Sequence, residues 1–127
     1  MFHYTVESTK NLQETIQSLE EELKQEQFGV LWELNINEKL EAKGLNLAET
    51  YRILEVCNPK EAYRVLSENP LVSYFLPCKI VVYEASGKVK VGMPKPTALI
   101  SMVEGDGLKE IAQDIENRLQ ACINKSI

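Results

Sequence analysis

The chain has few of the residues that build metal sites and disulfide frameworks. Its 127 residues include one histidine, one tryptophan and three cysteines. With His3 alone, a Cys–His catalytic pair or a three-ligand zinc site has little to draw on, so no metal or cofactor is expected. An odd number of cysteines does not fit a disulfide framework, and reduced thiols are expected.

The sequence also lacks an excess of positive charge and a long apolar run. The net charge is -5 at pH 7, which argues against nucleic acid as a partner. The longest apolar stretch, residues 71–83, is interrupted by Ser73, Pro77 and Lys79 and is too short to span a membrane. The first residues show neither the basic nor the apolar region of a signal peptide. We therefore expect a cytoplasmic protein with no membrane partner.

A glycine-rich phosphate loop is absent as well. Gly105-Asp106-Gly107 precedes a helical pattern, but no lysine follows at the required place. We interpret this segment as a turn and helix cap.

What the chain does have is a regular alternation of strand and helix patterns over one domain, residues 1–127. Apolar residues at helical spacing predict a long helix over residues 9–27 and another after Asp106, and alternating residues predict a hairpin turning at Ser86-Gly87. The predicted elements are strands 2–6, 29–36, 51–57, 78–85 and 88–93, and helices 9–27, a short one ending at Gly44, 59–68, a short one over 97–103, and the last one. Residues 71–77 fit either an extended segment or a helical turn.

The order β-α-β-(α)-β-α-β-β-α favours an α+β fold. We expect a single two-layer domain with a mostly antiparallel, curved sheet of about five strands and helices mainly on one face. The strand at 29–36 is predicted to have one deeply apolar face, which includes Val30, Trp32 and Leu34.

The two central strands are apolar on both faces. Ile80 and Val82 oppose Val81 and Tyr83, and the strand over residues 51–57 alternates in the same way. Such strands need cover on both sides. Helices supply one layer, and the other comes from a partner subunit, from the short helices or from a ligand pocket. Homodimerisation ranks first, because two-fold dimers are the commonest oligomers.

A cysteine lies directly before a helix start. In Cys57-Asn58-Pro59-Lys60-Glu61, Asn58 is a strong N-cap, Pro59 suits the first helical position, and Glu61 occupies the place of a capping-box acid. The positive end of a helix favours a thiolate, so Cys57 is a candidate nucleophile, redox group or soft-metal ligand, with Cys78 as its companion. The alternative is that both cysteines are small buried hydrophobic residues. The two thiols would lie at opposite ends of the sheet if their strands were parallel, and could meet if the strands were antiparallel.

Charged residues give a second set of candidates. Asn58, Glu55 and Lys79 are candidate ligand-binding residues, and any two of Glu33, Glu55 and Glu84 that met in a pocket would suggest acid–base chemistry. The lysines around the hairpin either form a solvated, edge-protecting face or contact an acidic partner or anionic ligand. They are Lys79, Lys88, Lys90 and Lys95.

Several of these motifs together resemble a known family. The run from Tyr51 to Pro59, then Ala62, then Leu76-Pro77-Cys78 leading into Val81-Val82-Tyr83-Glu84, is similar to the bacterial and archaeal family catalogued as domain of unknown function 302. The resemblance covers essentially the whole chain. It implies a compact α+β domain with a TATA-binding-protein-like fold, dimeric, and it implies no established activity; likeness to a DNA-binding fold is not evidence for DNA binding.

The sequence therefore predicts an uncharacterised soluble homodimeric domain that serves as a small-molecule-binding or interaction module. The alternative is a thiol-dependent redox, sulfur-transfer or ligand-capture activity centred on Cys57 and Cys78. Whether the domain is an enzyme stays open.

Overall fold

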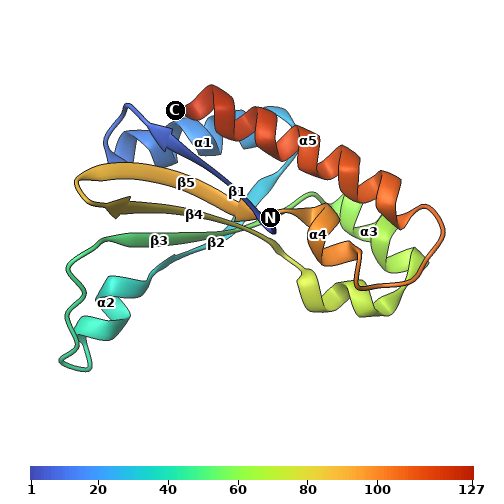
Figure 1. Ribbon diagram of the computed structural model, residues 1–127, viewed down its shortest axis with the longest axis horizontal. Helices are drawn as coiled ribbons and strands as arrows, with labels where there is room; N and C mark the ends of the chain where they lie inside the picture. Colours follow the sequence, from blue (N-terminus) through green and yellow to red (C-terminus); the bar gives the residue numbers. More distant parts are fainter.

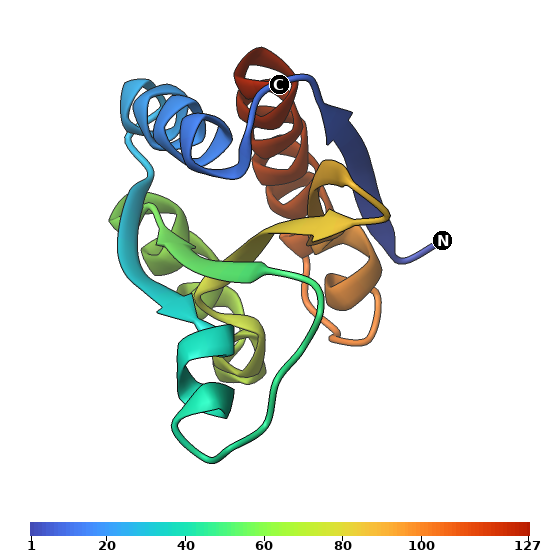
Figure 2. The same ribbon diagram turned by 90° about the vertical axis from the view of Figure 1, so that its left-hand side faces the viewer.

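One antiparallel sheet organises the molecule. The computed structural model describes all 127 residues, and its five strands lie in the order β1-β5-β4-β3-β2. The strands are β1 (His3–Ser8), β2 (Gly29–Asn35), β3 (Tyr51–Cys57), β4 (Cys78–Ala85) and β5 (Lys88–Pro94). Helices α1 (Leu12–Gln25) and α5 (Leu108–Ser126) lie side by side over one face of this sheet (Figures 1 and 2). The predicted α+β class and the predicted five-stranded antiparallel sheet are confirmed.

The two long helices begin where local capping allows. The Asn11 side chain accepts a hydrogen bond from the Glu14 backbone N–H, so α1 starts three residues later than predicted. Helix α5 follows Gly107 rather than Asp106, and Gly107 has φ +81°, a conformation that glycine adopts without a Cβ penalty. The apolar stripes of both helices are buried as their spacing predicts.

The central strands have one face in the core and one face without helical cover. On the helix side, four residues of these strands are fully buried: Leu54, Val56, Ile80 and Val82. The opposing residues Ile53, Val81 and Tyr83 are half-buried. Figure 1 shows this second face below the sheet, flanked by α2 (Ile36–Glu41) and by the segment that precedes β4. We call it the open face.

Strand β2 differs from its prediction. The pairing with β3 shifts register between Val30 and Trp32, so Val30 pairs with Val56 on the helix side while Trp32 pairs with Glu55 on the open face. Leu31 at the shift and Trp32 are 63% and 55% exposed. The expected single, deeply apolar face is therefore wrong, because a bulge moves the side chains after it to the other face.

The remaining segments are short helices around the sheet. Helix α3 (Pro59–Glu68) has its predicted bounds, and the ambiguous residues 71–77 contain a 3₁₀ helix, η1 (Pro70–Phe75). Helix α4 (Pro96–Ile100) is shorter than predicted and packs against α5. No helix combines the length and the apolar character needed to cross a membrane.

Candidate binding site

A cavity of about 560 Å³ lies at the end of the sheet where β4 begins and β5 ends. Fourteen of its nineteen lining residues are hydrophobic. The inner wall comes from the helices and from the helix side of the sheet, through Val65, Val72, Met93, Ile100, Ala112, Ile115 and Leu119. A largely apolar cavity of this size falls in the range of sites for small organic molecules.

The mouth of the cavity reaches the open face of the sheet. Trp32 and the neighbouring Leu31 line it together with Tyr74, which is 79% exposed. Exposed apolar side chains beside an apolar cavity are typical of a surface that contacts a ligand or a partner.

An ion pair stands at this mouth. Glu55 on β3 and Lys79 on β4 lie directly opposite each other in the strand register, and the Lys79 ammonium donates to a Glu55 carboxylate oxygen. Both residues line the cavity. The structure thus brings two of the predicted ligand-binding residues to one place.

Cys78 lines the same cavity, but its chemistry differs from the prediction. Burial, together with the nearby Cys57 and Glu55, raises the pKa of the Cys78 thiol to about 11. The group is therefore a neutral thiol at neutral pH, and a neutral thiol is a poor nucleophile.

Cys57 lies at the same end of the sheet without lining the cavity. Strands β3 and β4 are antiparallel, and Val56 pairs with Cys78, so Cys57 is next to that pair in the register. Strand alternation directs the two side chains to opposite faces. Both cysteines are free thiols.

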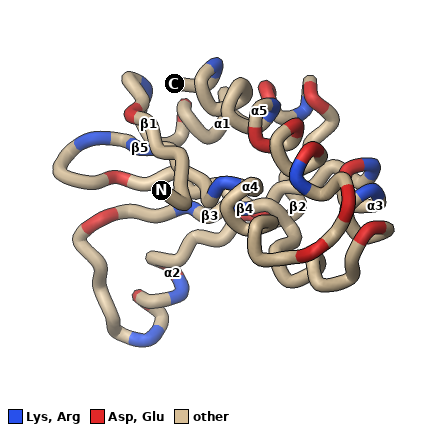
Figure 3. Tube along the Cα trace, turned by 45° about the vertical axis from the view of Figure 1, so that its right-hand side comes forward, with Lys and Arg blue, Asp and Glu red and all other residues tan.

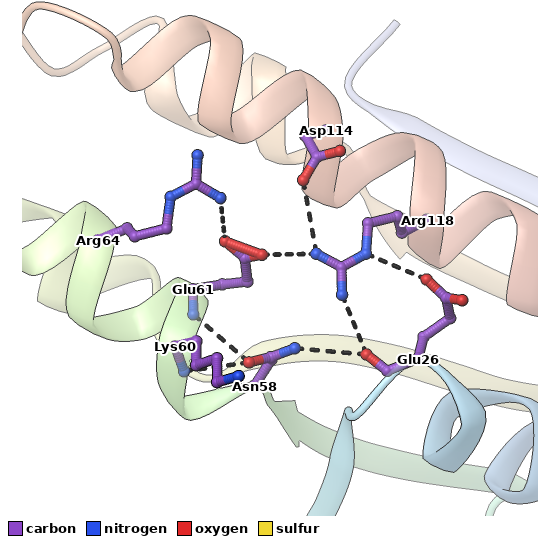
Figure 4. A network of polar contacts seen from close by, with 7 residues as sticks. All are labelled: Glu26, Asn58, Lys60, Glu61, Arg64, Asp114 and Arg118. Carbon is purple, nitrogen blue, oxygen red and sulfur yellow. Dashed lines mark hydrogen bonds and ion pairs between the residues drawn. The ribbon is translucent and has the colours of Figure 1, made fainter.

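Asn58 has a structural role outside the cavity. Its side-chain oxygen accepts hydrogen bonds from the backbone N–H groups of Lys60 and Glu61, at 3.0 and 3.4 Å, and its amide donates to the Glu26 carbonyl at 3.4 Å (Figure 4). The prediction that Asn58 caps α3 is confirmed. Glu61, however, does not complete a capping box, because its carboxylate accepts from two arginines instead.

Arg118 is the centre of a polar network that the sequence pattern does not reveal. Its guanidinium donates to the Glu61 carboxylate at 2.5 Å, to the Glu26 side chain at 3.1 Å and to the Glu26 carbonyl at 3.0 Å, and it lies 5.1 Å from the centroid of the Phe28 ring. Figure 4 shows how this residue joins α5, the start of α3 and the end of α1. A single arginine on the polar side of an amphipathic helix carries no signal for such a role.

The other predicted charged residues do not gather at a site. Glu33 lies on the helix side near Glu20, whose pKa is raised by burial and by the charge of Glu33. Lys88 pairs with Glu7 at 3.5 Å at the far end of the hairpin. Figure 3 shows acidic and basic positions interspersed over the helices and loops. No group of three His, Cys, Asp or Glu side chains is placed to hold a metal ion.

Comparison with known proteins identifies the family. The family model described as "Domain of unknown function DUF302" matches residues 4–126. The chain belongs to this family. It is also similar to an uncharacterized conserved DUF302 protein from Bacillus stearothermophilus of known crystal structure, with 58% sequence identity, a TM-score of 0.96, and coverage of 100% of this chain and 99% of that chain. No curated protein matches the chain. The predicted resemblance is confirmed, and the family description adds no activity.

Proposed function

We propose that this DUF302 domain is a binding module for an apolar small molecule, held in the cavity between the helices and the end of the sheet. The observation that supports the proposal is the cavity itself: about 560 Å³, lined mainly by hydrophobic residues, with an ion pair at its mouth. The cavity opens to solvent, so its apolar wall is accessible to a ligand. Transfer of the ligand's hydrocarbon from water into this cavity would supply the binding free energy.

A fluorescent probe tests this proposal. N-phenyl-1-naphthylamine is uncharged and apolar, and its emission rises in a dry site. Because Trp32 is the single tryptophan and lines the mouth, a dye bound there accepts energy from it. We expect saturable dye emission on excitation of Trp32.

Two matched variants locate the dye. Ala112→Leu adds side-chain volume at the cavity wall and is expected to remove binding, whereas Ala121→Leu makes the same change at an exposed position of the same helix. Should Ala112→Leu not fold, Leu99→Phe on α4 fills the cavity from another side. Failure of the wild type to bind the dye, or equal binding by all variants, would contradict the proposal.

We also propose that a second copy of the chain covers the open face. The centre of this face is formed by Ile53, Val81 and the stacked rings of Tyr51 and Tyr83, with ring centroids 5.7 Å apart. By register, the charged strand residues of this face are two acids, Glu7 and Glu55, and three bases, Lys79, Lys88 and Lys90. Two of the bases are paired on the face itself, in Glu55–Lys79 and Glu7–Lys88. Although the chain carries a net charge of -5, this face has no excess of negative charge and only one unpaired base, so two copies meet with little repulsion.

Light scattering at micromolar concentration measures the assembly. We expect a dimer for the wild type and a monomer for Val81→Glu, which places a charge at the centre of the open face. Gln113→Glu, at an exposed position on α5, is the control and should stay dimeric. A monomeric wild type would refute this second proposal without bearing on the cavity.

The thiol-dependent alternative has less support. The raised pKa of Cys78 removes the reactive pair, and the hypothesis then depends on Cys57 beside the start of α3. Alkylation of single-cysteine variants tests it: if Cys57 reacts no faster than a denatured thiol at neutral pH, the alternative fails.

A further inference from the structure

The cavity has two charged lining residues, and each already satisfies the other. Glu55 and Lys79 are paired across adjacent strands, and their side chains are 15% and 45% exposed. The carboxylate is therefore the more buried partner. Lys79 lines the cavity, and its ammonium donates to this carboxylate.

An ionised ligand would have to compete with this pair. A carboxylate that shared Lys79 would place two negative charges against one ammonium, and an ammonium that shared Glu55 would place two positive charges against one carboxylate. Either arrangement leaves one charge uncompensated beside the largely buried Glu55, which is costly because that charge also loses water. A hydroxyl or carbonyl oxygen, in contrast, accepts a hydrogen bond from the ammonium while the pair stays intact, because an ammonium has three donors.

The deeper part of the cavity offers no partner for a charged group of a ligand. Every buried side-chain nitrogen and oxygen of the protein has a hydrogen-bond partner. The remaining side-chain groups of the inner wall are hydrocarbon, the Met93 thioether and the Cys78 thiol. A charge carried inward would lose its hydration with no compensating contact.

We infer that the cavity selects an uncharged ligand: a hydrocarbon body that fills the interior, with at most one neutral hydrogen-bonding group at the Glu55–Lys79 pair. The inference rests on the proposed binding function and names its ligand class. The Glu55–Lys79 pair acts as a filter against charged ligands, because each side chain already neutralises the other and neither is free to pair with a ligand charge.

Three ten-carbon probes test the inference by displacing N-phenyl-1-naphthylamine at neutral pH. They are 1-decanol, decanoate and decylammonium, which share one chain and differ in head-group charge. We expect decanol to displace the dye with an affinity at least about tenfold higher than either ion. If the dye binds and an ion competes as well as the alcohol, the inference fails while the proposed binding function stands. If the dye does not bind, the proposed function itself fails.

Two variants of the pair sharpen the test. Glu55→Gln frees the lysine and should strengthen decanoate binding by about tenfold, and Lys79→Met frees the carboxylate and should strengthen decylammonium binding similarly. Decanol affinity should change by less than about threefold in both. Glu7→Gln, which removes the exposed pair with Lys88 on the same sheet, is the matched control and should leave the order unchanged. If both pair variants bound decanoate and decylammonium as the wild type does, the proposed selection by the Glu55–Lys79 pair would be contradicted.

Discussion

Asn58 shows how one side chain serves two purposes at the residue scale. It is buried, it caps two backbone N–H groups of α3, and it donates to the carbonyl of Glu26. We expect Asn58→Ala to lower the free energy of unfolding by about 2 kcal/mol, because the cap is lost and the part-buried Glu26 carbonyl loses one of its two side-chain donors. Urea denaturation measures the change. Asn11→Ala, an exposed cap with a single hydrogen bond, is the control and should cost about 1 kcal/mol; equal losses would contradict the second role.

The Cys78 thiol links stability to alkaline pH. Its pKa is raised from 9.0 to about 11 by burial and by Cys57 and Glu55, so the fold favours the neutral form. The thiol's contribution is therefore complete below pH 9 and is lost as the pH rises from 9 to 11, where the unfolded chain ionises first. We expect the stability difference between wild type and Cys78→Ala to shrink by on the order of 1–2 kcal/mol across this window, as measured by urea denaturation. A constant difference would contradict the raised pKa.

At the scale of elements, the Arg118 network joins three helices. Glu61, one of the carboxylates it holds, is 8% exposed. We expect Arg118→Met to lower the free energy of unfolding by about 3 kcal/mol, because it leaves that carboxylate buried with only the exposed Arg64 to pair with. Arg64→Met is the matched control, since it removes the other arginine on the same carboxylate, and it should cost no more than about 0.5 kcal/mol.

A double-mutant cycle separates this pair from general packing. Arg118→Met combined with Glu61→Gln should be more stable than the sum of the single changes implies, since the unpaired charge is gone. Additive losses in urea denaturation would show that Arg118 acts through its contacts with Glu26 and Phe28 instead.

Local patterns predicted most elements, and the misses have physical causes. Bounds for β3 and α3 follow from alternation and from the Asn58-Pro59 start, which are local signals. The bulge after Val30 has none, because Val30, Trp32 and Leu34 alternate without interruption in the sequence. The sequence does not predict the cavity for a different reason. Periodicity shows that Ala112 and Ile115 face inward, but it does not show that the space in front of these side chains is unfilled. The sequence presents Glu55 and Lys79 as candidates because of their places on strands, but only the strand register shows that the two residues lie opposite each other.

At the scale of the whole molecule, the cavity and the open face share residues. The row of Trp32, Glu55 and Lys79 at the mouth lies next to the row of Ile53 and Val81 in the sheet register. On the two proposals together, a second copy on the open face would shield the mouth and bury a bound ligand further. Ligand binding and dimerisation are then linked, and each must strengthen the other by the same factor.

We expect saturating 1-decanol to lower the dimer dissociation constant by about tenfold for the wild type and to leave it unchanged for Ala112→Leu, as measured by analytical ultracentrifugation. A dimer equally stable with and without the alcohol would mean that the partner does not reach the mouth, and a weakened dimer would mean that the ligand displaces it.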